Sequence, residues 1–260
     1  MLPLPIYSTR LGKLYNQDCL KVLKELHDNS LDCIFADPPF NLGKKYNAKI
    51  NDNKTYGEYL SWSINWVDEC VRVLKPGGSL FIYNIPRWNI HIANHLQQTL
   101  SFRHWIAIDY KASMPIPRKL YPAHYSLIYF TKGTPHRFRK LKTPIQICPH
   151  CNQPIKDYGG YKKYIIKNGG INLSDVWLDI SPVRHKGRKN GKNNELPEII
   201  LERILKMTTD RGYTVFDPFG GTGTTYAVAE RLGRRWLGCE IGSCNDIIKR
   251  LKRQRYATVN

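Results

Sequence analysis

The chain has 260 residues and is strongly basic, with 40 Lys and Arg against 21 Asp and Glu, a net charge of +19. This excess favours a polyanionic partner such as nucleic acid. A hydrophobic content of 42% provides ample material for a core, and no apolar run reaches the ~18 residues of a membrane span, so we expect no membrane partner. Residues 1–7 lack a signal-peptide pattern and the seven cysteines are dispersed, which predicts a cytoplasmic protein with reduced thiols.

Predicted strands and helices alternate along most of the chain. Apolar, β-favouring runs predict one strand ending near Asp18 and others over residues 31–36, 79–83, 104–110, 124–130, 213–216 and 236–241. Apolar residues at helical spacing predict helices over residues 20–26, 59–74, 88–100, 195–207 and 225–232. The alternation predicts an α/β fold with a doubly wound, mostly parallel sheet, which the strands at 104–110 and 124–130 close as a reversed pair.

Residues 132–193 interrupt the alternation and are expected to form an insert. Between residues 132 and 192 there are 14 Lys and Arg but only 3 Asp and Glu, with aromatic residues interleaved. The flanking segments, 1–131 and 194–260, would then form one domain. The basic run at 249–255 is expected to be a solvated helix face.

A glycine-rich turn follows the predicted strand at 213–216 and leads into the next helix. Its sequence is Asp217-Pro218-Phe219-Gly220-Gly221-Thr222-Gly223-Thr224. Such a turn lets a ligand approach the backbone closely, although these glycines match neither the phosphate loop nor the dinucleotide fingerprint. Glu240 ends the following strand, where an acid hydrogen-bonds ribose hydroxyls in nucleotide sites. A purely structural turn is the alternative.

A second motif, Asp37-Pro38-Pro39-Phe40, follows the predicted strand at 31–36. Its two prolines remove two backbone donors and stiffen the chain, so that carbonyl oxygens stay free and the Asp37 side chain points outward. A stiff loop with a capping Asp is the alternative. In doubly wound sheets, ligands bind beyond the carboxyl ends of the strands, so folding would bring this motif close to the glycine turn.

The two motifs together resemble the S-adenosylmethionine-dependent amino-methyltransferases of DNA. Asp37, Pro38, Pro39 and Phe40 look like the catalytic tetrapeptide of that family. The order, with the tetrapeptide first and the cofactor loop last, resembles the circularly permuted beta class that accompanies restriction systems. The cofactor site that the resemblance implies consists of Asp18, Cys19, Asp37, Pro197, Phe216, Asp217, Pro218, Phe219, Gly220, Gly221, Gly223, Thr224 and Glu240.

The same resemblance implies a Rossmann-like methyltransferase fold with residues 1–131 as the catalytic part, 132–193 as the target-recognition insert and 194–260 as the cofactor-binding part. Double-stranded DNA is the implied substrate, and a cognate restriction endonuclease and a homodimer are the partners to look for. On bare chemistry, Asp18 serves equally well as a helix N-cap.

Five basic residues are predicted to contact DNA. Lys44 and Lys45 lie in the polar segment 41–54, which would cover the active site, and the others lie at the basic end of the insert. Those are Arg184, Lys186 and Arg188.

Cys148-Pro149-His150-Cys151 provides half of a zinc knuckle. A closed site needs two further ligands, and neither His136 nor His185 has knuckle spacing. We therefore expect a turn with two incidental thiols and no metal.

The chemistry of an exocyclic amine suggests a role for the tetrapeptide. The lone pair of such an amine is delocalised into the base, and two acceptors, the Asp37 side chain and the Pro38 carbonyl, would localise it. The base would be flipped out of the duplex and stacked on Phe40. Because an acid at position 37 goes mostly with adenine in the resembled family, we expect adenine-N6 methylation. The alternatives are cytosine-N4 methylation, an RNA or protein-glutamine methyltransferase, and a non-catalytic nucleic-acid-binding protein.

Overall fold

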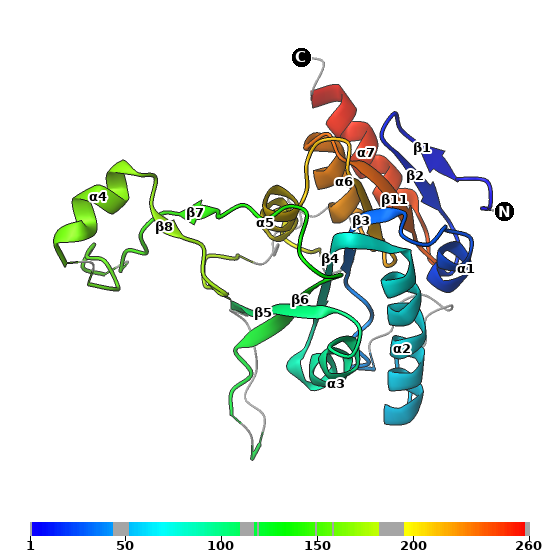
Figure 1. Ribbon diagram of the computed structural model, residues 1–260, viewed down its shortest axis with the longest axis horizontal. Helices are drawn as coiled ribbons and strands as arrows, with labels where there is room; N and C mark the ends of the chain where they lie inside the picture. Colours follow the sequence, from blue (N-terminus) through cyan, green and yellow to red (C-terminus); the bar gives the residue numbers. More distant parts are fainter. Residues whose placement is uncertain are drawn as a thin grey trace.

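A computed structural model describes residues 2–43, 52–109, 117–118, 120–148, 150–157, 159–181 and 195–257. Its centre is a nine-stranded sheet with helices on both faces (Figure 1). The strands are β1 (Tyr7–Ser8), β2 (Gly12–Tyr15), β3 (Leu31–Ala36), β4 (Leu74–Asn84), β5 (Ser101–Asp109), β6 (His124–Thr131), β9 (Val176–Trp177), β10 (Thr214–Asp217) and β11 (Arg235–Cys239). The helices that cover it are α1 (Cys19–Lys24), α2 (Tyr56–Val73), α3 (Pro86–Leu96), α5 (Glu198–Thr208), α6 (Thr224–Arg231) and α7 (Asn245–Ala257).

The strand order is β1-β2-β11-β10-β3-β4-β6-β5-β9. Strands β2, β11, β10, β3 and β4 run parallel to one another, whereas β6 is antiparallel to both β4 and β5. The predicted doubly wound, mostly parallel sheet with a reversed pair is therefore confirmed. Each crossover between the parallel strands is long enough to carry a helix, as such connections require.

The core lies in two layers, one on each face of the sheet. On β3, Cys33 and Phe35 face a layer shared with α5, α6 and α7, whereas Ile34 and Ala36 face a layer shared with α1, α2 and α3. Alternate side chains of a strand point to opposite faces, so a continuous apolar run such as residues 31–36 marks a strand that is buried on both sides.

Several element boundaries differ from those predicted. Helix α2 starts three residues early because Thr55 and Glu58 form a capping box. Strand β4 begins directly after α2, at Leu74 rather than at the predicted residue 79. Helix α3 begins at Pro86, a residue whose fixed φ suits a first helical turn, and ends at Leu96 rather than at residue 100. In the described part of the chain, no helix has the length and apolarity to cross a membrane.

The segment predicted as an insert has two parts. A small lobe projects beyond one end of the sheet (Figure 1), and it contains β7 (Lys142–Thr143), β8 (Ile171–Asn172), η1 (Gly159–Tyr161) and α4 (Lys162–Lys167). The chain then returns to the sheet, where β9 pairs with β5 and Trp177 is buried in the core. The division at residues 132 and 193 stays a prediction.

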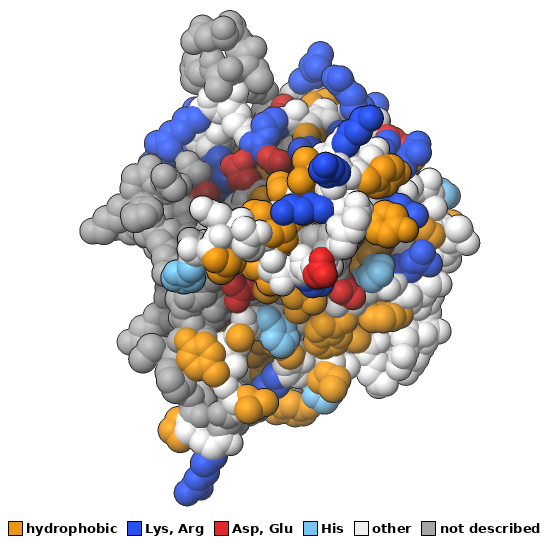
Figure 2. All heavy atoms as spheres, turned by 90° about the vertical axis from the view of Figure 1, so that its left-hand side faces the viewer, with side chains coloured by type: hydrophobic (Ala, Val, Ile, Leu, Met, Phe, Trp, Pro, Cys, Tyr) orange, Lys and Arg blue, Asp and Glu red, His pale blue; other side chains and the backbone are white. Residues whose placement is uncertain are grey.

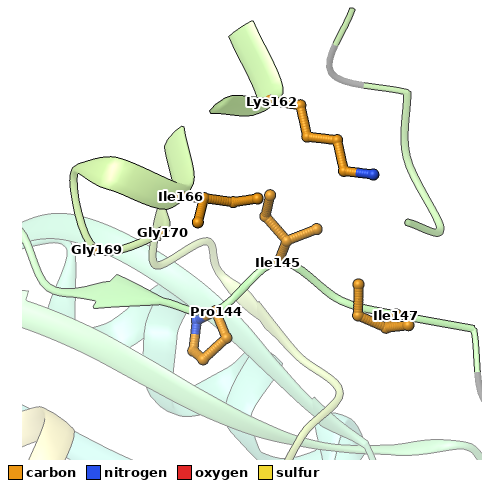
Figure 3. A pocket seen from close by; sticks show the side chains of 7 residues that line it. All are labelled: Pro144, Ile145, Ile147, Lys162, Ile166, Gly169 and Gly170. Atoms are coloured by element: carbon orange, nitrogen blue, oxygen red, sulfur yellow. The ribbon is translucent and has the colours of Figure 1, made fainter. Parts of the chain in front are cut away.

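A hollow of about 340 Å³ lies within the lobe. Figure 3 shows that Ile145 and Ile166 point toward each other across it, with Lys162 at its rim. Its lining comes from the lobe itself and includes neither predicted motif, so it carries no part of the candidate active site.

Candidate active site

Four parallel strands end beside one another at the same edge of the sheet. Phe216 of β10 pairs with Ile34 of β3, Asp217 pairs with Gly238 of β11, and Gly238 pairs with Leu14 of β2. The predicted site residues that follow these strands are therefore brought to one edge. They are Asp37 after β3, Asp217 at the end of β10, Glu240 after β11 and Asp18 after β2.

Asp217 is the buried anchor of the glycine turn. Its carboxylate accepts a hydrogen bond from the backbone N–H of Phe219 (2.9 Å) and another from the Thr225 hydroxyl. Burial raises the pKa of Asp217 well above its usual range, and the negative charges of Asp37 and Glu240 add to the shift. Asp217 thus fixes the start of the turn at Phe219 and its end at Thr225.

The glycines of this turn meet specific geometric demands. Gly221 and Gly223 have positive φ angles of 53° and 79°, a region that favours glycine. A Cβ atom on Gly223 would come within 2.8 Å of Ile247 Cγ2, whereas a Cβ on Gly221 would meet only the Phe219 carbonyl oxygen, at 3.9 Å. The space above Gly221 is therefore open, so a ligand can reach its backbone.

Glu240 is held by the same turn. One carboxylate oxygen accepts the backbone N–H of Gly221 (2.9 Å) and the other accepts that of Gly242 (2.6 Å). Burial raises its pKa, and these two hydrogen bonds oppose the shift. Because each carboxylate oxygen can accept more than one hydrogen bond, Glu240 can still receive a pair of hydroxyl donors.

The segment that carries Asp18 and Cys19 is anchored to the Glu240 turn. Asn16 donates to the backbone carbonyls of Glu240 and Gly242, both at 2.7 Å. Asp18 caps α1 by accepting from Leu20 N–H at 2.8 Å, so its role as an N-cap is confirmed. Burial, together with the charge of Asp18, raises the pKa of Cys19 to about 12, so this thiol stays protonated at neutral pH.

The start of α5 packs against the glycine turn. Pro197 is its N-cap residue, and the carbonyl of the preceding Leu196 accepts a hydrogen bond from the Thr224 hydroxyl at 3.3 Å. Arg250 donates to Glu195 at 2.6 Å and to Thr224 at 3.0 Å. Arg250 is only 4% exposed, so the expectation that the run at 249–255 is wholly solvated is wrong at this position. It is buried because it pairs with a carboxylate that is itself buried.

The tetrapeptide is fixed by two aromatic residues that the sequence reasoning missed. The Tyr59 hydroxyl donates to the carbonyl of Pro39 at 2.6 Å, and the Trp88 indole N–H donates to the carbonyl of Phe40 at 2.7 Å. In the part of the chain that the structure describes, no donor contacts the carbonyl of Pro38. Tyr59 and Trp88 thus engage two of the three successive carbonyls.

Phe40 forms one wall of an aromatic group. Its ring centroid lies 5.9 Å from that of Tyr83 and 5.6 Å from that of Tyr125, both at tilted angles. The side chain is only partly buried against the core. The predicted contact with a flipped base stays a prediction.

All five basic residues predicted to contact DNA lie outside the described residues: Lys44, Lys45, Arg184, Lys186 and Arg188. The segment after the tetrapeptide is nevertheless closed at its base, because Asp52 accepts the backbone N–H groups of Asn41 (2.8 Å) and Leu42 (3.1 Å). These hydrogen bonds hold Asp52 next to Asn41, the residue that follows Phe40.

Helix α4 of the lobe is basic and has exposed aromatic side chains on it and beside it. On and beside α4, Tyr161 is 74% exposed and Tyr164 is 66% exposed, and the helix carries three lysines and no acid. Those lysines are Lys162, Lys163 and Lys167. Figure 2 shows Lys and Arg side chains gathered over the upper part of the face that carries the lobe, with hydrophobic side chains among them.

The two lobe cysteines form a tight turn. The Cys148 carbonyl accepts from Asn152 N–H at 2.9 Å, and Cys148 N–H donates to Gln153 at 2.8 Å. Backbone N–H groups of Cys151 and His150 lower the pKa of the Cys148 thiol. Within the described ranges, no three His, Cys, Asp or Glu residues gather in a way that could hold a metal ion. His136 packs against Gly77 of β4, and His185 lies outside these ranges.

Two proteins of similar sequence are Type II methyltransferases. The Type II methyltransferase M.BamHI of Bacillus amyloliquefaciens is 54% identical over 249 residues, which cover 95% of this chain and 59% of that protein, so the chain spans under two thirds of its length. M.HpaI of Haemophilus parainfluenzae is 34% identical over 233 residues, 88% of this chain and 70% of that one.

Solved structures share the fold. The PvuII DNA methyltransferase (cytosine-N4-specific) superposes with a TM-score of 0.65 at 19% identity, covering 96% of this chain and 94% of that chain. An M1.HpyAVI–SAM complex gives 0.62 at 18% identity, covering 94% and 99%. A family model described as DNA methylase, for N6 and N4 methyltransferases, matches residues 31–249. The chain therefore belongs to the N6/N4 DNA methylase family.

Proposed function

We propose that this chain transfers a methyl group from S-adenosylmethionine to the exocyclic amine of a base in double-stranded DNA. The observation that carries the proposal is the convergence of the tetrapeptide and the glycine turn at one edge of the sheet, where Asp37 contributes to the pKa of Asp217. Its relatives M.BamHI and M.HpaI are Type II methyltransferases, which supports DNA as the substrate.

The residues at this edge fit S-adenosylmethionine. The open backbone at Gly221 suits the amino-acid end of the molecule, and Glu240 suits the two hydroxyls of its ribose. Asn16 and Asp18 lie beside Glu240, where the adenine would lie, and Pro197 packs near the opposite end. The cofactor supplies an electrophilic methyl group on a sulfonium centre. A fold neighbour was solved as a complex with this molecule, which supports the assignment.

Asp37 and Pro38 prepare the amine. The carboxylate of Asp37 accepts one amine N–H and the carbonyl of Pro38 accepts the other, so that the nitrogen lone pair is no longer delocalised into the base. Both acceptors stand on a stiff proline turn, which keeps them in place without reorganisation. Phe40 stacks on the flipped base, a contact worth ~1–3 kcal/mol per base in single-strand binders.

Adenine-N6 is the proposed target, because Asp37 is an acceptor with no donor and an acid at this position goes mostly with adenine in the family. Cytosine-N4 is the second candidate, since the PvuII enzyme with the same fold is named as cytosine-N4-specific. Mass spectrometry of nucleosides from methylated DNA distinguishes N6-methyladenine from N4-methylcytosine. A signal only from N4-methylcytosine would reject adenine while leaving the roles of Asp37 and Pro38 unchanged.

The chain would act in the cytoplasm beside a cognate restriction endonuclease, in keeping with the Type II relatives, and a homodimer is proposed from the family resemblance. Incubation of the protein with labelled S-adenosylmethionine and DNA, RNA or protein tests the proposal. Label is expected in DNA alone. Label only in RNA or protein, or none at all, would reject it.

A further inference from the structure

The carbonyl groups of the tetrapeptide are not equivalent. Those of Pro39 and Phe40 are each engaged by a buried aromatic donor, the first by the Tyr59 hydroxyl at 2.6 Å and the second by the Trp88 indole at 2.7 Å. Tyr59 is 1% exposed and Trp88 is 2% exposed, so water does not compete for either hydrogen bond. The two donors come from different helices, Tyr59 from α2 and Trp88 from α3. Their ring centroids lie 4.4 Å apart.

Behind Tyr59 lies a further buried polar side chain. The Asn84 amide donates to the Tyr59 hydroxyl at 3.0 Å, while the Asn84 carbonyl oxygen accepts the backbone N–H of Ile85 at 2.7 Å. This arrangement leaves the hydroxyl proton of Tyr59 directed at Pro39. The Ser126 hydroxyl in turn donates to the Asn84 backbone carbonyl at 2.8 Å, which ties the network to β6.

Such a network destabilises the fold unless each of its polar groups has a partner, because an unpaired buried polar group keeps the cost of its lost hydration. Packing alone would be served equally well by Phe at position 59. Burial raises the pKa of Tyr59, so the hydroxyl remains a neutral donor at physiological pH. A neutral donor can hold a carbonyl without adding charge next to Asp37.

We propose that Tyr59 and Trp88 are positioning residues for methyl transfer. By holding the carbonyls of Pro39 and Phe40, they fix the two peptide planes that follow Pro38 and so keep the Pro38 carbonyl in place next to Asp37. The inference rests on the proposed function, since it assigns the Pro38 carbonyl to the target amine. It predicts that the two donors affect the chemical step and leave ligand binding unchanged.

The test uses Tyr59→Phe and Trp88→Phe, both of which keep an aromatic ring. The first removes the hydroxyl that bonds to Pro39 and Asn84, and the second removes the indole bond to Phe40. Single-turnover methylation of DNA is measured per cofactor-binding site, so that any unfolded fraction is not counted. We expect the rate to fall about 10- to 100-fold, as misplacement of a reacting group by about 1 Å does. The affinity for S-adenosylmethionine and the KM for DNA should stay within about twofold of wild type.

Two matched controls remove the same kinds of bond elsewhere. Tyr129→Phe removes a buried hydroxyl that contacts Ser79 (3.3 Å) in the middle of β4, and Trp177→Phe removes an indole bond to the carbonyl of Ser174 (2.8 Å). Both controls should keep the wild-type rate. Equal rates for the control and test variants, or a rise in KM with an unchanged rate, would overturn the inference. A wild-type protein that does not methylate DNA would instead reject the proposed function.

Discussion

The carboxylate of Asp37 raises the pKa of Asp217, although the two residues belong to motifs far apart in the sequence. Burial of Asp217 is the larger cause, and the charge of Asp37 adds to it. The effect follows from topology: β3 and β10 are neighbouring parallel strands, so the residues that end them meet at the same edge. One motif can thus hold the substrate while the other holds the cofactor.

Asp37→Ala should separate binding from chemistry. Removal of the carboxylate takes away one of the two acceptors for the amine, so methyl transfer should fall by at least about 100-fold, as it does when one electrostatic contact to a reacting group is lost. Binding of S-adenosylmethionine, measured by calorimetry, should persist. Turnover near the wild-type rate in a filter-binding methylation assay would contradict the role of Asp37.

Gly223→Ala should weaken both stability and cofactor binding. The residue has a φ of 79°, and an added Cβ would lie 2.8 Å from Ile247 Cγ2. Gly212→Ala is a matched control, because Gly212 has a φ of 82° but nothing lies within 4 Å of an added Cβ. We expect the control to lose about 1–2 kcal/mol of unfolding free energy and to bind cofactor normally. Equal cofactor affinity in the two variants would show that the clash is unimportant.

Asp217→Asn should change how stability depends on pH. Because the folded-state pKa of Asp217 is raised, the folded protein binds a proton more tightly than the unfolded chain does. The contribution of Asp217 to the free energy of unfolding is fully present at pH values below its pKa in the unfolded chain. It is lost as the pH rises through its pKa in the folded protein. Wild type should therefore lose unfolding free energy over that range relative to the variant. Denaturant titrations at several pH values that show a constant difference would refute the prediction.

The lysines of α4 should contribute to DNA binding. Replacing Lys162, Lys163 and Lys167 with Ala should lower the slope of log affinity against log salt by about two to three, since each phosphate contact contributes about 0.9. Replacing the exposed Lys13, Lys21 and Lys24, which lie on β2 and α1 away from the lobe (Figure 1), is the control and should leave the slope nearly unchanged. An unchanged slope in the α4 variant would exclude this helix from the DNA path.

A parallel experiment addresses residues outside the described ranges. Replacing Arg184, Lys186 and Arg188 with Ala should also flatten the salt dependence, with little effect on cofactor affinity. If only one of the two triple variants changes the slope, fluorescence titrations will identify which part of the basic segment meets the phosphates.

The sequence predicted the sheet well because its signals are local. The apolar run at 31–36 became β3 without change, and the helix predicted over residues 225–232 became α6 (Thr224–Arg231). Strand alternation then implied a common carboxyl edge for Asp37 and Glu240. These inferences needed only spacing, turn residues and the rule for parallel strands.

Other features depend on contacts between distant segments and could not be read in advance. Tyr59 and Trp88 looked like core residues of amphipathic helices, and only the fold shows that their polar atoms reach the tetrapeptide. Arg250 lies in a basic run, where charge alone suggests solvent, yet it pairs with the buried Glu195. Strand β9 has two residues, too few for a periodic pattern, so its return to the sheet gave no sequence signal.

The most direct test of the account is single-molecule sequencing of DNA from cells that express the wild-type chain or Asp37→Ala. The wild type should leave a methylated amino group, on adenine N6 or cytosine N4, at one recurring DNA sequence, and Asp37→Ala should leave none. Unmodified DNA from cells with the wild-type protein, or the same methylation pattern with Asp37→Ala, would contradict the assignment of this site.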